Sequence, residues 1–194
     1  MRFPVRRPPS LRALLAAALL VLLAGCSDTE GTGDKGYITG DGQIQQLAPA
    51  ERGDPIELTG PGLDGEEIDL ADRRGQPVAV VVWGSWCAPC RAEAPELAEL
   101  SAERDDASFV GINIRDSSEE NAKSFNRTFG IEYPSFYSPT GEALLAFDGT
   151  LTPNTIPSTV VLDDRGRVAA SIIGPLPSKQ TLAELIDEVV TEDG

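Results

Sequence analysis

An uncharged, apolar run that ends at a pair of cysteines stands in the middle of this sequence. Residues 78–82 are only alanine and valine, a short β-branched pattern typical of a strand buried on both faces of a mostly parallel sheet. The run leads through Trp86 to Cys87-Ala-Pro-Cys90, after which residues 91–104 are rich in the helix formers Ala, Glu and Leu. The cysteines therefore stand where a central strand passes into a helix, and we interpret them as a redox-active dithiol/disulfide pair.

The spacing of the two cysteines assigns a different role to each. Positions three apart on a helix share one face, so Cys87 and Cys90 can close a small disulfide ring. Cys87 stands at the helix start, where free N–H groups and the helix dipole favour a thiolate, and it is the expected nucleophile. Cys90 is one turn further in and more enclosed, which suits a resolving thiol. Pro89 fits the first helical turn, where its missing N–H costs little and its ring stiffens the loop.

Two other interpretations of the cysteine pair are a stabilising disulfide and half of a zinc site. Structural zinc takes four ligands, whereas the sequence has three cysteines and no histidine, so two chains would have to share the metal. A structural disulfide would not explain an exposed Trp86 at a strand-to-helix junction, where open α/β sheets place their active sites. We therefore expect no metal and no cofactor beyond the Cys87–Cys90 disulfide itself.

The composition excludes several classes of function. The chain has 194 residues, enough for one ordinary domain with appendages. The absence of histidine removes Ser-His-Asp and Cys-His nucleophilic machinery and histidine metal sites. The formal net charge is −15, and cleavage of the arginine-bearing N-terminus would make it more negative, so we expect a well-solvated surface and no nucleic-acid partner.

Residues 1–25 have the features of a secretory signal peptide, with arginines before a Leu- and Ala-rich run at 11–23. The sequence Leu-Ala-Gly-Cys26 resembles the lipobox of bacterial lipoproteins, which implies cleavage before Cys26 and lipid attachment to its thiol. Alternatives are an ordinary secretory peptide with an incidental cysteine, a twin-arginine signal at 6–7, or a spanning anchor, although the apolar run is shorter than the ~20 residues that a spanning helix needs. We expect a lipid-anchored protein on the extracytoplasmic face of the cell membrane.

The remaining chain divides into a tether and a domain. Residues 26–53 are predicted to be flexible, with at most a short strand near residues 37–38, because Gly, Asp, Gln, Thr and Ser show no sustained period there. Residues 54–194 are predicted to form the domain. It begins with a hairpin of strands at 55–58 and 67–70, where polar and apolar residues alternate around a turn-rich segment.

Strands and helices are expected to alternate after the cysteine helix. The patterns predict strands at 109–114, 158–163 and 167–173, a short helix at 142–147, and capped helices that begin after Ser117 and Thr181. The last two strands are joined by a hairpin turn and are therefore antiparallel. This order predicts an α/β fold in which helices flank a mixed sheet, with parallel strands in one half and a hairpin in the other.

These features together resemble the thioredoxin fold, and in particular its extracytoplasmic TlpA/ResA-like branch of membrane-tethered thiol-disulfide oxidoreductases. The resemblance covers about residues 50–192 and rests on the Trp-Cys-x-Pro-Cys sequence at 86–90, Pro95, Ile156-Pro157, the N-terminal hairpin and the segment at 115–147. It implies that Pro157 is a cis-proline beside the dithiol and that Ile156 exposes its backbone to an extended substrate chain. The alternative is an ordinary trans proline at the start of a strand.

The same resemblance implies a role for Glu93, and it shows that this chain lacks a carboxylate that classical thioredoxins have. Glu93 matches an acidic residue near the dithiol of some ResA-like proteins, where it could shuttle protons for Cys90; the alternative is an exposed helix glutamate. Val81 occupies the position at which classical thioredoxins have a buried aspartate. Supporting roles therefore fall to Trp86, Pro157 and Glu93.

The family implies a disulfide reductase that acts on protein disulfides, is supplied with electrons by an integral membrane thiol donor, and often serves in cytochrome c maturation. Within the enzyme class, the alternative is a net oxidant or isomerase of secreted proteins. A peroxiredoxin is disfavoured because its pattern needs Pro and Thr where Val80 and Gly84 stand. From another class, a scaffold or Cu(I)-binding lipoprotein is the alternative, since Cu(I) suits thiolates, but the only methionine is Met1.

Overall fold

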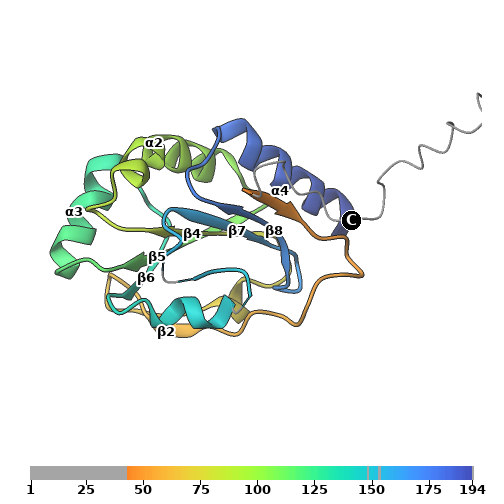
Figure 1. The fold of residues 1–194 in the computed structure, drawn as a ribbon, viewed down its shortest axis with the longest axis horizontal. Helices are drawn as coiled ribbons and strands as arrows, with labels where there is room; N and C mark the ends of the chain where they lie inside the picture. The colour runs from red at the N-terminus through yellow and green to blue at the C-terminus, as the bar shows by residue number, and fades with distance from the viewer. Residues whose placement is uncertain (1–42, 148, 153, 194) are drawn as a thin grey trace, which may run out of the picture. The chain divides into compact units, whose positions relative to one another are not determined.

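A six-stranded mixed sheet forms the centre of the described structure (Figure 1). The computed structural model describes residues 43–147, 149–152 and 154–193. The strands lie in the order β1-β8-β7-β4-β5-β6, with β4 parallel to β5, β5 parallel to β6, and the other neighbours antiparallel. Their bounds are β1 Ile44–Gln46, β4 Val78–Trp83, β5 Ser108–Ile114, β6 Ser135–Ser138, β7 Ser158–Leu162 and β8 Val168–Ile173. The predicted mixed sheet, with a parallel half and a hairpin half, is confirmed.

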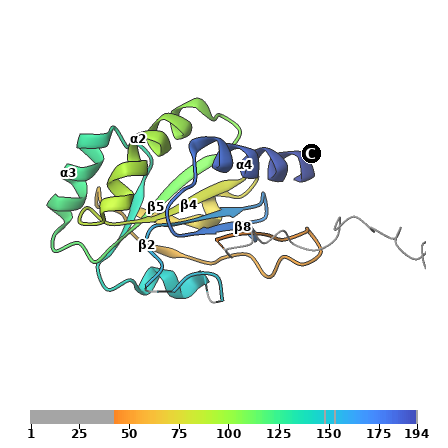
Figure 2. The ribbon, with the colours of Figure 1, turned by 45° about the horizontal axis from the view of Figure 1, so that its top comes forward.

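The sheet is covered on both faces, which explains why β4 is apolar throughout. Three helices, α2 (Ala88–Glu103), α3 (Glu119–Phe129) and α4 (Lys179–Asp193), lie on one side (Figures 1 and 2). A small sheet of β2 (Thr59–Pro61) and β3 (Glu67–Asp69) lies on the other side with the 3₁₀ helices η1 (Leu70–Arg73) and η2 (Glu142–Phe147). All six residues of β4 are buried between the two core clusters.

The N-terminal boundary of the folded domain differs from the prediction. Residues 44–46 form the edge strand β1, paired antiparallel with β8, and the backbone N–H of Ile173 donates to the carbonyl of Gln43 at 2.7 Å. Arg52 is also buried. The prediction of a tether through residue 53 is therefore wrong for this segment, because its contacts are to strands more than a hundred positions away, which no local pattern shows.

The predicted signal peptide, Cys26 and the suggested strand near residues 37–38 all lie outside the described residues. Within the ranges that the structure does describe, none of the helices has the length and apolar character needed to cross a bilayer.

Several element starts also differ from those expected. The first hairpin strand is β2, not residues 55–58, because the N–H of Ile56 donates to Gly166 in the β7–β8 turn. Helix α3 is capped by Ser118, one position after the predicted residue, and its hydroxyl accepts from the N–H of Asn121. Helix α4 starts at Lys179, and the hydroxyl of Ser178 accepts from the N–H of Thr181 at 3.1 Å. Strand β6 was not predicted.

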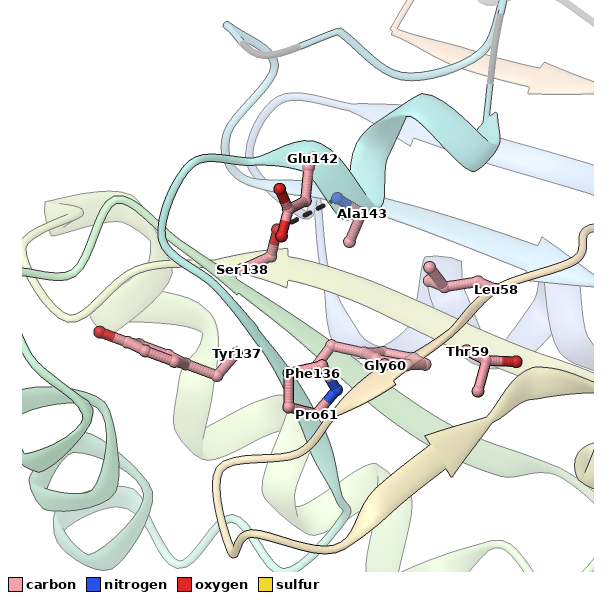
Figure 3. Close-up of a pocket in the computed structure, with 9 residues that line it drawn as sticks. All are labelled: Leu58, Thr59, Gly60, Pro61, Phe136, Tyr137, Ser138, Glu142 and Ala143. Atoms are coloured by element: carbon pink, nitrogen blue, oxygen red, sulfur yellow. Dashed lines mark hydrogen bonds between the residues drawn. The ribbon is translucent and has the colours of Figure 1, made fainter.

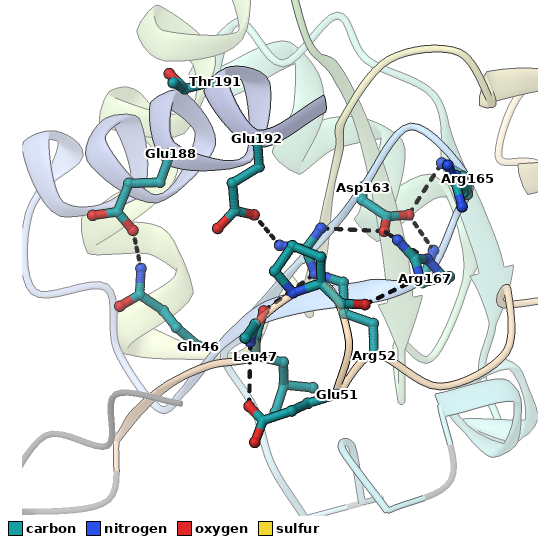
Figure 4. Close-up of polar contacts among 12 residues, drawn as sticks. Gln46, Leu47, Glu51, Arg52, Asp163, Arg165, Arg167, Glu188, Thr191 and Glu192 are labelled. Atoms are coloured by element: carbon teal, nitrogen blue, oxygen red, sulfur yellow. Dashed lines mark hydrogen bonds and ion pairs between the residues drawn. The ribbon is translucent and has the colours of Figure 1, made fainter. Parts of the chain in front are cut away.

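A buried ion network joins the N-terminal segment to the far end of the sheet (Figure 4). The guanidinium of Arg52 donates to Asp163 at 3.2 Å and also pairs with Glu192 in α4. Asp163, in the turn between β7 and β8, accepts from the Nε of Arg167 at 2.8 Å. The side chains of Arg52 and Asp163 are 1% and 0% exposed. This network anchors the segment that leads into the domain.

Candidate active site

The turn between β4 and α2 places the two cysteines at the N-terminus of the helix, as the sequence predicted. Cys87 is the N-cap residue, and Pro89 lies in the first turn of α2. The two sulfur atoms form a disulfide of 2.02 Å, with the Cα atoms 5.3 Å apart. The N–H of Cys90 donates to the sulfur of Cys87 at 3.2 Å. A negative sulfur at this position would meet the free N–H groups of the first turn, which stabilise a thiolate.

The two cysteines differ less in enclosure than expected. Cys87 is 4% exposed and Cys90 is 2% exposed, so both lie at the edge of the helix-side core. Their different roles must therefore come from their positions on the helix. Trp86, directly before them, is 49% exposed, and its indole N–H donates to the carbonyl of Ile114 at 3.3 Å. The hydrogen bond to the end of β5 thus holds the exposed tryptophan beside the disulfide.

A buried aspartate that the sequence analysis missed holds the turn before Cys87. Asp116 is 5% exposed, and its carboxylate accepts from the backbone N–H of Ser85 at 2.9 Å and from the side chain of Asn113 at 2.6 Å. It also accepts from the hydroxyl of Ser85. The signal that could have found Asp116 is its place just after a strand parallel to β4, because the carboxyl ends of parallel strands meet at one edge of the sheet.

The turn also requires a glycine at position 84. A Cβ there would lie 2.7 Å from the indole nitrogen of Trp86 and 3.0 Å from the carbonyl oxygen of Ile114. A larger residue would therefore displace Trp86 from its hydrogen bond, so Gly84 lets the dithiol turn approach β5 closely.

The loop before β7 reaches the same edge of the sheet. The peptide bond between Ile156 and Pro157 is cis, in agreement with the resemblance. Ser158, which starts β7, pairs with Val82 near the end of β4, so Pro157 lies at the end of the sheet from which Cys87 emerges. Ile156 is partly buried and packs against both core clusters. The structure therefore brings the cis-proline loop and the dithiol turn together.

Glu93 is buried rather than exposed on its helix. The residue is 7% exposed, and its carboxylate accepts from the backbone N–H of Leu176 at 2.9 Å. Burial raises the pKa of Glu93 to about 7; the Leu176 hydrogen bond opposes the rise, and the charge of Glu96 adds to it. Burial also raises the pKa of the Tyr133 phenol, with a further contribution from the charge of Glu93.

Glu93 has access to solvent through a cleft beside the dithiol. The cleft has a volume of about 240 Å³ and is lined by residues of α2 and of the loop before α4, including Pro89, Glu93, Glu96 and Leu176. Val81, at the position where classical thioredoxins have a buried aspartate, is 1% exposed in the core cluster that contains both cysteines, so no carboxylate lies there. Glu93 is therefore a carboxylate, one turn along the helix from Cys90, that could exchange a proton at neutral pH.

A second hollow lies on the opposite face of the sheet (Figure 3). It has a volume of about 130 Å³ and lies between β2, β6 and η2, with Leu58, Pro61 and Phe136 among its lining residues. Neither cysteine lines it, and Phe136 belongs to the core cluster on the side away from the dithiol. We assign this hollow no part in the redox chemistry. In the described part of the chain, there is no group of three His, Cys, Asp or Glu side chains placed to hold a metal ion.

Comparison with known proteins identifies relatives along most of the chain. The family model described as Redoxin matches residues 45–186. The thiol:disulfide interchange protein HelX of Rhodobacter capsulatus is 32% identical over 143 residues, which cover 74% of this chain and 74% of that protein. The thiol-disulfide oxidoreductase ResA of Bacillus thuringiensis is 29% identical over 119 residues, 61% of this chain and 66% of ResA.

Solved structures of related proteins have the same fold. A DsbF homologue from Corynebacterium diphtheriae superposes with a TM-score of 0.72 at 34% identity, covering 79% of this chain and 98% of that one. A secreted thiol-disulfide isomerase from Corynebacterium glutamicum gives a TM-score of 0.71 at 29% identity, covering 81% and 97% of the two chains. The matched region begins with β1, in agreement with the corrected N-terminal boundary.

Proposed function

The chain belongs to the Redoxin family, as a thioredoxin-fold thiol-disulfide oxidoreductase of the TlpA/ResA-like kind, and we propose that it is a lipid-anchored disulfide reductase outside the cytoplasm. The observation that carries the proposal is the Cys87–Cys90 disulfide at the N-terminus of α2, with the cis Ile156–Pro157 loop at the same edge of the sheet. Its electrons come from an integral membrane thiol donor, and its clients are extracytoplasmic protein disulfides, with apocytochrome c as one candidate.

The proposed reaction starts from the reduced dithiol. The Cys87 thiolate attacks one sulfur of the client disulfide, so a mixed disulfide forms and one client cysteine leaves as a thiolate that takes up a proton. Cys90 then loses its proton and attacks the Cys87 sulfur, which releases the second client thiol and closes the Cys87–Cys90 disulfide. Two electrons pass to the client, and the membrane dithiol donor returns two electrons to the protein. Glu93 receives the Cys90 proton, and Ile156 offers backbone hydrogen bonds to the extended client chain.

Location outside the cytoplasm is proposed from the signal-like sequence at 1–25 and the lipobox-like sequence before Cys26. The related thiol-disulfide isomerase of Corynebacterium glutamicum is a secreted protein, which supports this location. A mature protein that carries an unmodified Cys26 in the membrane fraction, as determined by mass spectrometry, would refute the lipid anchor.

The Cys90→Ser variant is expected to accumulate mixed disulfides between Cys87 and its clients, because the resolving thiol is gone while the nucleophile remains. Adducts recovered from the native host should be released by a reductant and identified by mass spectrometry. The double variant Cys87→Ser/Cys90→Ser is the matched control and should recover none of them. Adducts at equal levels in both variants would contradict the assigned roles.

Glu93→Gln is expected to flatten the dependence of folding stability on pH. Because the folded-state pKa of Glu93 is raised from 4.5 to about 7, its contribution to stability is full below pH 4.5 and is lost as the pH rises towards 7. The wild type should therefore lose up to about 3 kcal/mol of this contribution over that window, and the variant should not. Urea unfolding from pH 4.5 to 8 measures this, with the exposed Glu132→Gln as control.

The same variant tests the proposed proton transfer. If Glu93 accepts the Cys90 proton, Glu93→Gln should shift the thiol titration curves of the reduced protein and slow release of the client from the mixed disulfide. Unchanged titration curves would remove Glu93 from the mechanism and would leave its burial as a structural feature only.

The relative described as an isomerase keeps a net oxidant or isomerase as the second candidate. The two directions differ in the resting state of the dithiol, because a reductase is held reduced in the cell whereas an oxidant is held as the disulfide. Alkylation of free thiols in intact cells, together with a measured reduction potential, discriminates between them. Metal analysis of the reduced protein tests the Cu(I)-binding alternative.

A further inference from the structure

Two arginines lie beside the dithiol turn without a carboxylate partner. The chain has 31 acidic and 16 basic residues, and most of the basic side chains that the structure describes are in ion pairs. Arg91 and Arg115 are exposed, and neither is in an ion pair with a described residue. Cations that have no partner in so acidic a protein suggest a partner on another molecule.

Both arginines are next to groups that hold the dithiol turn. Arg91 donates to the carbonyl of Ser85 at 3.4 Å and lies over the ring of Phe129. Arg115 follows Ile114, whose carbonyl accepts from Trp86, and precedes Asp116, which holds Ser85. Each exposed guanidinium donates one of these hydrogen bonds and has five N–H donors, so donors remain for a ligand.

Arg115 also contacts the loop that carries the cis-proline. Its guanidinium donates to the side chain of Asn154 at 3.3 Å, two residues before Ile156 in the loop that ends at the cis-proline. The Arg115 guanidinium thus contacts the loop along which an extended client would pair, while its backbone stands between Ile114 and Asp116, which hold the dithiol turn. The neighbouring carboxylate of Asp116 is buried and accepts three hydrogen bonds from Ser85 and Asn113, and it forms no ion pair with Arg115.

The backbone at Arg115 has an unfavourable conformation for a residue with a side chain. Its φ is 55°, and among the described residues it is the only one apart from glycines with a positive φ. A non-glycine residue rarely adopts this left-handed region, and such outliers cluster at functional sites. Glycine would suit the backbone better, so the arginine side chain itself is a feature to be explained.

We propose that Arg115, assisted by Arg91, binds a carboxylate side chain close to the reacting cysteine of the client. The ligand is an extended peptide segment with Asp or Glu next to its cysteine, held by charge-assisted hydrogen bonds to the guanidinium groups and by contact with exposed Trp86. The inference rests on the proposed disulfide reductase function and adds only client selection; the thiol exchange steps are unchanged.

Peptides with one internal disulfide test the proposal directly. Three peptides that differ only in the residue beside the attacked cysteine, Glu, Gln or Lys, are reduced by the purified, pre-reduced full-length protein, and second-order rate constants are compared. The Glu peptide should react about fivefold faster than the Gln peptide, the range expected of one favourable exposed charge contact. Since the whole chain is acidic, a salt titration would mix global repulsion with local attraction, so variants are required.

The preference for the Glu peptide should fall to less than twofold in Arg115→Gly, which removes the charge and suits the left-handed backbone, and should be kept in Arg115→Lys. Arg165→Gln makes the same change of net charge in the β7–β8 turn, at the opposite end of β7, and should leave the preference intact. The double variant Arg91→Gln/Arg115→Gly should react with the three peptides at similar rates.

An unchanged preference in Arg115→Gly and in the double variant, or an equal loss of rate on all three peptides, would overturn this inference and leave the reductase function standing. Failure of the wild type to reduce any of the peptides would instead overturn the proposed function, and the inference with it. Melting temperatures of the variants distinguish lost recognition from lost folding.

Discussion

Replacing Cys87 by serine is expected to abolish disulfide reduction, with a loss of activity on the order of a thousandfold or more. The reason is that the attacking species is a thiolate, and Cys87 is the cysteine at the N-cap of α2, where the first-turn N–H of Cys90 already donates to its sulfur. A serine hydroxyl at the same place does not ionise near neutral pH and does not exchange with disulfides. Reduction of insulin disulfides, followed by turbidity, measures the effect.

The matched control is Cys90→Ser, which removes the same disulfide but keeps the nucleophile. Both variants should fail to turn over, yet only Cys90→Ser should form a stoichiometric mixed disulfide with a single equivalent of client. Retained turnover in Cys87→Ser, or adduct formation through Cys90 at the same rate, would refute the order of attack. Because both cysteines are buried, unfolding curves of the two variants must be compared with that of the oxidised wild type.

The dithiol could be predicted from the sequence because everything that defines it is local. The strand at 78–83, the cysteines at its end and the helix after them are contiguous, so periodicity and helix propensity suffice. The burial of Glu93 could not be predicted in this way, since it depends on Leu176, which lies 83 residues further along the chain. The family resemblance singled out Glu93, and only the structure shows that its carboxylate is buried.

Asp116 and the strand β1 show two different reasons for failure. Asp116 had a usable signal, its position after a strand parallel to β4, but an aspartate followed by serines equally fits a polar loop. Strand β1 had no signal, because three residues without alternation cannot be distinguished from a tether. Its pairing with β8 and the buried Arg52 appear only when the distant partners are in place.

Asp163→Ala is expected to destabilise the domain by about 3–5 kcal/mol, because it removes the buried carboxylate of an ion pair and the acceptor of several hydrogen bonds at once. The Asp163 carboxylate is the acceptor for Arg52 and Arg167 and for the backbone N–H groups of Arg165 and Arg167 (Figure 4). After the substitution, Arg52 loses this buried carboxylate and keeps its contacts with Glu192 and with the carbonyl of Leu47. Urea unfolding at pH 7 measures the change, which is a large part of the 5–15 kcal/mol typical of a domain.

Two further variants, one in this network and one at an exposed ion pair elsewhere, test the explanation. Asp163→Asn keeps an acceptor for the turn N–H groups but removes the charge, and its cost should be smaller, about 2 kcal/mol. Lys123→Ala, which removes an exposed i,i+4 pair with Glu119, should cost less than about 0.5 kcal/mol. A cost for Asp163→Ala as small as that of Lys123→Ala would mean that the N-terminal segment is not anchored by these contacts.

The pH dependence gives the network an independent signature. Burial alone would raise the pKa of Asp163, but the hydrogen bonds from Arg167 and Arg52 outweigh it and hold the pKa below its usual range. A lowered folded-state pKa means that the stabilisation is present above the ordinary aspartate pKa and is lost as the pH falls through the lowered value. Acid unfolding of the wild type should therefore show this loss, and Asp163→Asn should not. Glu93 acts in the opposite sense at higher pH, so Glu93→Gln and Asp163→Asn should flatten opposite limbs of the same stability curve.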